Sequence, residues 1–473
     1  MGIVSGSVLA VDLTIGCSCP GASAGREDGG EVGSSMLNTV RAFLGAEFNR
    51  NVLTLVTGTG LAQLIPIAVM PLLARIYTPE QFGVLALFVA VVSPLSVIAT
   101  GRYELAIMLP RKDGDATNLA ALSVVISLLV SAVLFACICA FNRPISNALG
   151  NQAISTWLYL VPLAVLLNGI YSNFNYWSNR HKLYFMMAHR RVLHSGGTAT
   201  VQLGLGLMRT GAGGLVIGLI SGQTLAIGLM ANIVRRHSPR YWRAIDAKEM
   251  WALAKRYKSC PQFLVPAHAL GALATQLPAL FINTTFGLSA TGSYMLAERV
   301  VALPLSLIST SIGDVFRQEI AERFHAGEHC RSQFLSTLRK LTAIATPPFL
   351  ILLFCAPALF AIVFGERWRI AGEYAQLMCP MFYLRFISNP LSLVAIVAQR
   401  NRFEFLWQVG LLVFLVLAAG SHHVVQLEEK TYVAIFTAIY CTFDFVNLVA
   451  SYRFACAGDS RHQQPVELIG RDD

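Results

Sequence analysis

The sequence predicts an all-α membrane protein with about twelve transmembrane helices, and three observations carry that prediction. The chain is 55% hydrophobic and only 13% charged, whereas soluble domains average about 25% charged residues. Its mean hydropathy is +0.57, and its longest charge-free stretches exceed the roughly 20 residues that a helix needs to cross a bilayer. Lysine and arginine gather in alternate loops, which is typical of a multi-pass membrane protein.

Apolar runs separated by charged turns define the individual helices. Long stretches without a charged residue include 51–74, 116–142, 144–179, 210–234, 259–297 and 341–365. Each is long enough to span a bilayer as a helix. We expect transmembrane helices over residues 52–74, 82–109, 118–141, 154–174, 192–208, 212–233, 263–285, 291–313, 341–364, 372–398, 403–421 and 431–453.

The distribution of basic residues predicts the orientation of these helices. If the chain starts in the cytoplasm, the inward loops carry 21 lysines and arginines and the outward loops carry 6. That bias predicts a multi-pass membrane protein with both termini cytoplasmic. The net charge of +10 then reflects topology and gives no indication of nucleic-acid binding, because the basic residues are spread along one membrane edge.

The expected spans divide into two halves joined by a basic linker. We expect a first six-helix lobe over 50–234, a linker over 235–260, a second six-helix lobe over 261–455 and a cytoplasmic tail over 456–473. Apolar residues recur at helical spacing within the linker, which predicts an amphipathic helix on the inner membrane surface. A short internal echo, in which Gly83 precedes Pro94 and Gly292 precedes Pro304 at nearly the same distance, favours parallel six-helix repeats.

The first 35 residues differ in kind from the rest of the chain. Glycine, serine, alanine and acidic residues dominate 1–35, so the segment is either disordered or an over-called start with Met36 as the true initiator. Two of the ten cysteines, Cys17 and Cys19, lie in this tail, and Cys137 and Cys139 lie in an expected helix. Neither pair has a second ligand pair at zinc-site spacing, and we therefore expect no metal or other cofactor.

Three arginines fall inside the expected spans: Arg102, Arg299 and Arg385. An arginine at the bilayer centre costs about 2.5–3.5 kcal/mol on the insertion scale, so three facing lipid would cost roughly 8–10 kcal/mol. They are therefore expected to face protein or water. A guanidinium binds two phosphate oxygens at once, and the three together predict a path for an anionic, diphosphate-bearing substrate.

Three carboxylates lie beside or among these arginines as counter-ions or ion-coupling groups: Glu104, Glu298 and Asp444. On continuous helices Arg102 and Glu104 would point about 200° apart, and Glu298 and Arg299 about 100° apart. We therefore expect each arginine to find its partner on another helix or in water. Four polar residues could contact sugar hydroxyls or hold helices together, namely Gln63, Gln276, Asn283 and Tyr294.

Four motifs resemble those of a known family. They are residues 71–83 (PLLARIYTPEQFG), 102–110 (RYELAIMLP), 177–182 (WSNRHK) and 292–299 (GSYMLAER). The chain is similar over about residues 50–455 to bacterial polysaccharide repeat-unit flippases of the Wzx type, in the multidrug/oligosaccharidyl-lipid/polysaccharide (MOP) exporter superfamily. The first two motifs are fairly specific and the other two are loose.

The resemblance implies a two-lobed bundle around a cationic central cavity. It also implies that an undecaprenyl-diphosphate-linked oligosaccharide is flipped between leaflets by alternating access, for lipopolysaccharide O-antigen or exopolysaccharide biosynthesis. The partners it implies are this lipid-linked oligosaccharide, membrane lipids, a proton or sodium gradient and the polysaccharide polymerase machinery. Because the family's cavity arginines vary in position, assigning that role to Arg102, Arg299 and Arg385 is a hypothesis.

Two other function classes remain open at the level of sequence. An ion-coupled multidrug antiporter of the same superfamily would need an acidic, aromatic cavity, and the three arginines argue against that. A polysaccharide polymerase or membrane glycosyltransferase would need a large outward loop, and the outward loops here are short. Walker, His-Glu-x-x-His and Gly-x-Ser-x-Gly patterns in a catalytic setting are absent from the sequence. We therefore expect a transporter and not an enzyme.

Overall fold

The computed structural model describes Gly60 and residues 62–237, 245–325, 330–394, 401–421 and 426–456. The expected N-terminal tail with Met36, part of the linker and almost all of the C-terminal tail lie outside the described residues. Within the described ranges the regular structure is helical and contains no strand. An all-α architecture, as predicted, is confirmed.

The described helices follow the expected apolar runs in order. In the first half (62–237) they are Ala62–Ile76, α2 Pro79–Ala99, α3 Tyr103–Ala106, α4 Asp113–Ala148, α5 Ser155–Leu158, α6 Val161–Arg180, α7 Tyr184–Leu207 and α8 Ala212–His237. The linker contains α10 Ala247–Arg256. In the second half (260–456) they are a π-helical turn Cys260–Leu264, α11 Val265–Phe286, α12 Leu288–His325, α13 Arg331–Phe364, α14 Arg369–Leu391, α16 Asn401–Ser421 and α17 Glu429–Cys456.

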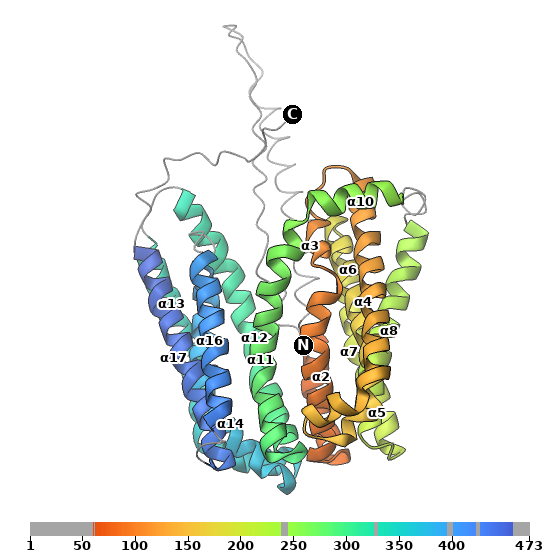
Figure 1. The fold of residues 1–473 in the computed structure, drawn as a ribbon. Coiled ribbons are helices and arrows are strands. Elements are labelled where there is room, and N and C mark those ends of the chain that lie inside the picture. Colours follow the sequence, from red (N-terminus) through yellow and green to blue (C-terminus); the bar gives the residue numbers. More distant parts are fainter. Residues whose placement is uncertain are drawn as a thin grey trace, which may run out of the picture.

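The long helices form two groups that lie side by side (Figure 1). Helix α2 of the first half packs against both α11 and α12 of the second half. The groups meet at the end that carries the turns around residues 77, 150, 287 and 366, and they diverge toward the opposite end (Figure 1). We call the first of these the junction end.

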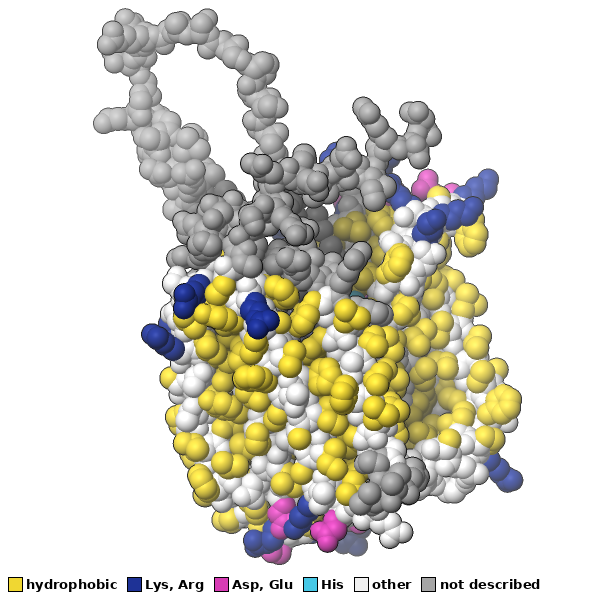
Figure 2. Space-filling model, turned by 60° about the vertical axis from the view of Figure 1, so that its left-hand side comes forward, with side chains coloured by type: hydrophobic (Ala, Val, Ile, Leu, Met, Phe, Trp, Pro, Cys, Tyr) yellow, Lys and Arg dark blue, Asp and Glu magenta, His cyan; other side chains and the backbone are white. Residues whose placement is uncertain are grey.

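The helical surface fits a membrane protein. Six described helices are long and apolar enough to cross a bilayer, and a seventh span results if the pair Gln152–Leu158 and Val161–Arg180, bent by 52°, counts as one. Large exposed side chains such as Leu129, Phe354 and Ile362 are apolar. Figure 2 shows hydrophobic side chains over the flank, with charged side chains gathered at the two ends. The chain is thus a multi-pass membrane protein, and the figure of twelve spans stays a prediction.

Helix α2 differs from the single helix expected over 82–109. It begins earlier, because the Thr78 hydroxyl accepts from the Gln81 amide in a capping box with Pro79 at the first turn. It ends at Ala99, because Gly101 and Arg102 adopt left-handed backbone angles (φ 58° and 59°), which interrupt an α-helix. A separate short helix, α3, follows. The continuous helix through Arg102 was a wrong prediction.

Helix α7 also differs from expectation. It begins at Tyr184, eight residues before the expected start at 192. Arg190 and Arg191 fall between the expected spans 154–174 and 192–208, in what would be an inward loop, yet both are within this helix, and Arg190 is buried. Loop assignment from charge failed here, because a helix whose polar side chains face other helices needs no apolar run to be stable.

At the junction end, α2 and α12 approach through two glycines. A Cβ placed on Gly83 would lie 2.1 Å from the Leu288 carbonyl oxygen, and one on Gly292 would lie 1.8 Å from the Pro79 carbonyl oxygen. The contact is reciprocal, since each glycine faces the backbone four residues before the other. These are the two glycines of the internal echo. Only residues without a Cβ allow the helices to come this close.

A tryptophan fastens the same end. The buried Trp368 indole donates to the Ala74 carbonyl at 2.7 Å, and its ring packs edge-on against Phe82 at 5.2 Å between centroids. Beside it, Arg367 donates to the Arg75 carbonyl at 2.7 Å. All these contacts join residues about 290 positions apart in the chain, so they hold the first half to the second.

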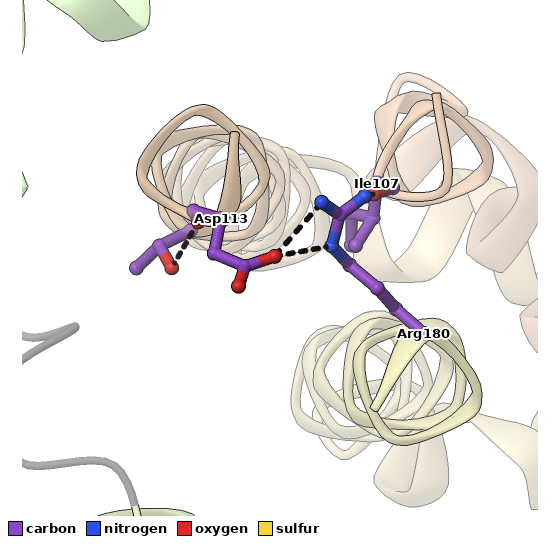
Figure 3. Close-up of polar contacts among 4 residues, drawn as sticks. Ile107, Asp113 and Arg180 are labelled. Carbon is purple, nitrogen blue, oxygen red and sulfur yellow. Dashed lines mark hydrogen bonds and ion pairs between the residues drawn. The ribbon is translucent and has the colours of Figure 1, made fainter. Parts of the chain in front are cut away.

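At the opposite end, Arg180 ties three elements of the first half together. It donates twice to one Asp113 carboxylate oxygen, at 3.1 and 2.9 Å, and once to the Ile107 carbonyl at 3.0 Å (Figure 3). The linker packs on this end too, because the Tyr103 hydroxyl donates to the Ala254 carbonyl of α10 at 3.1 Å. Arg180 thus fixes the last turn of α6 against the start of α4 and the segment after α3.

Candidate functional site

Three helices of the second half bring charged and tyrosine side chains together inside the helical bundle. Arg385 of α14 forms an ion pair with Asp444 of α17, with 3.5 Å between Nε and Oδ2. Its guanidinium lies over the Tyr440 ring, 4.6 Å from the centroid. Tyr294 and Glu298 of α12 also interact with it electrostatically. We call these five residues, together with Arg299, the second-half cluster.

The second-half cluster is electrically balanced. Asp444 is buried with 3% exposure, and burying an unpaired carboxylate would be expensive, so Arg385 compensates it. Arg299 interacts electrostatically with Glu298. The cluster therefore holds two arginines and two carboxylates, and its net formal charge is zero. In a balanced cluster of this kind, an arginine can bind an incoming anion only when its carboxylate partner moves away or takes up a proton or cation.

Arg102 lies apart from the second-half cluster, at the end where the halves diverge. Its Nη1 is 3.3 Å from Glu104 Oε1, and Glu104 is 1% exposed. The expectation that these two side chains cannot pair was wrong. It assumed a continuous helix, whereas the helix is interrupted by the left-handed backbone at Gly101 and Arg102. Tyr176 of α6 and His268 of α11 lie within electrostatic reach of Arg102.

The four polar candidates for sugar contacts do not lie together. Asn283 is 2% exposed and donates to the Leu149 carbonyl at 2.6 Å, so it joins the two halves at the junction end. Tyr294 is part of the second-half cluster. Gln63 is half-buried, with a side-chain oxygen that has no hydrogen-bond partner. Gln276 is half-buried on α11. A role of these residues in sugar binding stays a prediction.

Sequence reasoning missed one buried charged site altogether, between α6 and α7. Arg190 is 1% exposed. It donates to the Tyr171 carbonyl at 3.0 Å and to Asn175 Oδ1 at 2.6 Å, and its guanidinium lies 4.0 Å from the centroid of the Tyr171 ring. A signal for this site was present in the sequence. Tyr171 and Asn175 are four residues apart, so they lie on one face of a helix that has one charge in 20 residues. Such a polar stripe needs a partner on another helix.

These sites can bind and exchange ions, but they show no nucleophile poised beside a base. Over the described part of the chain, no three histidine, cysteine, aspartate or glutamate side chains are grouped so that they could hold a metal ion. What these sites do show is charge pairing between largely buried side chains.

Comparison with known proteins places the chain in a family. The family model described as "Polysaccharide biosynthesis protein" matches residues 72–372. The chain is 23% identical over 314 residues to the succinoglycan biosynthesis transport protein ExoT of Rhizobium meliloti, covering 65% of this chain and 61% of that protein. It is 27% identical over 137 residues to the lipopolysaccharide biosynthesis protein WzxC of Escherichia coli (strain K12), covering 29% of this chain and 28% of that protein.

A third relative is the teichuronic acid biosynthesis protein TuaB of Bacillus subtilis (strain 168), 25% identical over 158 residues, or 33% of each chain. The chain thus spans less than two thirds of the length of these three relatives.

Solved structures show the same fold. The lipid II flippase MurJ in an inward closed conformation superposes with a TM-score of 0.68 at 10% identity, covering 85% of this chain and 87% of that one. An inward-facing MATE multidrug transporter of the MOP superfamily superposes with a TM-score of 0.63 at 14% identity, covering 85% and 95%. Because the family model matches more than half of the chain, the chain belongs to the polysaccharide biosynthesis protein family, and it has the fold of MOP transporters.

Proposed function

We propose that this protein translocates undecaprenyl-diphosphate-linked oligosaccharide repeat units across the bacterial inner membrane for surface polysaccharide synthesis. Twelve spans form two six-helix lobes around a central cationic cavity, and both termini are cytoplasmic. The lipid tail stays in the bilayer while the head crosses between the lobes. Family membership supports this function over that of a drug antiporter, whose fold is the same.

The observation that carries the proposal is the second-half cluster, in which charged side chains of three neighbouring helices interact. Its arginines and carboxylates lie on three helices, α12, α14 and α17, so their pairing depends on how those helices pack. A diphosphate that enters beside Arg385 would compete with Asp444 for the guanidinium. Ion pairs that exchange partners let a charged head pass through a region of low dielectric without leaving any charge unpaired.

The arrangement of the halves supports alternating access. The glycine contact and the Trp368 hydrogen bond close the junction end, which the charge bias of the loops predicts to be periplasmic. The halves diverge at the other end (Figure 1). In the proposed cycle the head group binds from the cytoplasmic side, the junction contacts separate, and the lobes rock to release it outside. Asp444 and Glu298 are the candidate carboxylates for coupling to a proton or sodium gradient.

The test is accumulation of substrate in a deletion strain. Removing the gene from its native bacterium should abolish or reduce surface polysaccharide, while lipid-linked repeat units build up on the cytoplasmic side of the membrane. The repeat units are measured by extraction and mass spectrometry. Unchanged surface polymer with no build-up of lipid-linked sugar would refute the proposal, and a changed resistance to cationic drugs alone would favour the antiporter.

A point variant tests the second-half cluster within this proposal. Arg385→Ala leaves Asp444 buried without its partner, and export should fall at least tenfold at normal membrane abundance. Arg369→Ala, on the same helix but exposed and paired with Glu366, is the matched control and should export normally. Normal export by an abundant Arg385→Ala protein would remove that residue from the mechanism.

A further inference from the structure

Arg190 on α7 is a fully buried arginine held by neutral groups. Two of its nitrogens donate to the Tyr171 carbonyl and the Asn175 side chain. Its face lies on the Tyr171 ring. The remaining nitrogen, Nε, is buried and has no hydrogen-bond partner. The side chain is thus anchored, yet the Nε donor of its guanidinium is unused.

Arg190 differs from three other arginines of the protein in how its charge is compensated. Arg102, Arg180 and Arg385 each have a carboxylate within 3.3, 2.9 and 3.5 Å respectively. The charged or ionisable groups within electrostatic reach of Arg190 are Tyr171, His194 and a second cation, Arg191. Among the described residues, no aspartate or glutamate contributes. The positive charge of Arg190 is therefore not offset within the described protein.

A buried cation without a carboxylate is costly to maintain. Hydrogen bonds to neutral acceptors and the face of one tyrosine ring recover only part of the lost hydration. The adjacent Arg191 charge adds to the cost. An oxyanion would remove this penalty, because charge-assisted hydrogen bonds to a guanidinium are stronger than those to neutral acceptors.

We propose that Arg190 is a binding residue for the diphosphate of the lipid carrier, an inference that rests on the proposed function. The planar guanidinium suits two phosphate oxygens. To take them, Arg190 turns its fork away from Asn175 and keeps its stacking on Tyr171. It lies about 9 Å along α7 from Tyr184 at 1.5 Å per residue, near the end where the halves diverge. This is where a head group arriving from the cytoplasm enters.

Asn175→Asp gives the sharpest test, because aspartate has nearly the shape of asparagine and differs from it mainly in charge. The new carboxylate would sit where Asn175 Oδ1 now accepts, at 2.6 Å, and would neutralise Arg190 in place. A purely structural Arg190 would be stabilised or unaffected by this change. A diphosphate-binding Arg190 would lose its ligand. Arg190→Ala removes the cation and Arg190→Lys keeps the charge but loses the fork.

The experiment measures binding of undecaprenyl diphosphate, with undecaprenol as the uncharged comparison, to the full-length protein in nanodiscs by native mass spectrometry. Wild type should prefer the diphosphate. Asn175→Asp should reduce that preference at least tenfold with an unchanged or higher Tm, and Arg190→Lys should fall between. Arg143→Ala, an exposed arginine of α4, should bind like wild type.

Two outcomes overturn the inference. One is a folded Asn175→Asp protein that binds undecaprenyl diphosphate with wild-type affinity. The other is a wild type that binds undecaprenol and undecaprenyl diphosphate equally. If Arg190→Ala does not fold, Asn175→Asp decides alone. The proposed function is judged separately, by lipid-linked sugar in the deletion strain, so the export proposal can stand when the Arg190 assignment fails.

Discussion

The contact between Gly83 and Gly292 predicts that one methyl group changes the balance between conformations. Gly292→Ala would place a Cβ 1.8 Å from the Pro79 carbonyl oxygen, whereas ordinary contact begins at 3.4 Å. The helices α2 and α12 must therefore separate by about 1.6 Å at this point, or another conformation must take over. The neighbouring atom is backbone, so no side-chain rotation relieves the clash.

The size of the effect follows from overpacking energies. An extra methyl group in a packed interface typically costs about 1–3 kcal/mol. If the junction end opens during transport, that cost falls only on the joined state, and the equilibrium shifts toward the open state by roughly 5–150-fold. The variant should therefore populate a form in which the two halves are farther apart at the junction end.

Double electron–electron resonance between spin labels on the two halves measures this shift. Labels at Arg209→Cys and Glu428→Cys are exposed on opposite halves, in a background without the ten native cysteines. Gly292→Ala should move the distance distribution to longer values. Gly228→Ala is the matched control, because a Cβ there meets nothing within 4 Å.

An unchanged distance distribution for Gly292→Ala, in a protein of normal abundance and Tm, would refute the interpretation that the junction end opens during transport. The junction end would then be a static contact. A lower Tm without a longer distance would have the same meaning, because the methyl group would have destabilised the fold as a whole and not one of two conformations.

Further predictions concern three other contacts. Trp368→Phe leaves the buried Ala74 carbonyl without its donor, at a cost of about 1–3 kcal/mol, and should lengthen the same spin-label distance; an unchanged distance would count against a lock at this site. Arg180→Ala removes three hydrogen bonds and should lower the Tm by several degrees, with Arg180→Lys recovering only part, whereas equal Tm values would show the contact to be dispensable. Burial lowers the pKa of His181 below its ordinary value, against the opposing charge of Asp113; the unfolded chain therefore binds the proton more readily, and stability should fall as the pH drops below about 6.5. In His181→Gln the Tm difference between pH 7.5 and 5.5 should be smaller, and an identical difference would exclude this histidine.

The helical membrane architecture could be predicted because its signal is large and local. A run of about 20 uncharged, mostly apolar residues is typical of a membrane-spanning helix, and the runs at 116–142 and 341–365 fall almost entirely within α4 and α13. The resemblance drawn from residues 71–83 and 102–110 is confirmed by the family match over 72–372. These signals need no knowledge of how the helices pack.

The candidate site could be predicted only in part, because pairing depends on backbone detail and on neighbours. Arg385 and Asp444 were both selected, but their contact joins helices about 60 residues apart in the chain. The Arg102–Glu104 pair depends on two left-handed residues, and a single glycine in an apolar run is too weak a signal to place a break. Asn283 was a candidate sugar contact, while its amide joins the halves.

The glycine contact of the junction end and the second-half cluster share helix α12, and this has a thermodynamic consequence. Gly292 and Glu298 are six residues apart on α12, about 9 Å along its axis. A ligand that binds the second-half cluster more tightly in one arrangement of α12 must favour that arrangement. By linkage, a change at Gly292 that shifts the opening equilibrium must also alter the apparent affinity of the cluster, by at most the factor by which the ligand alters opening. Opening and binding are then two measures of one coupling energy, carried by a single helix.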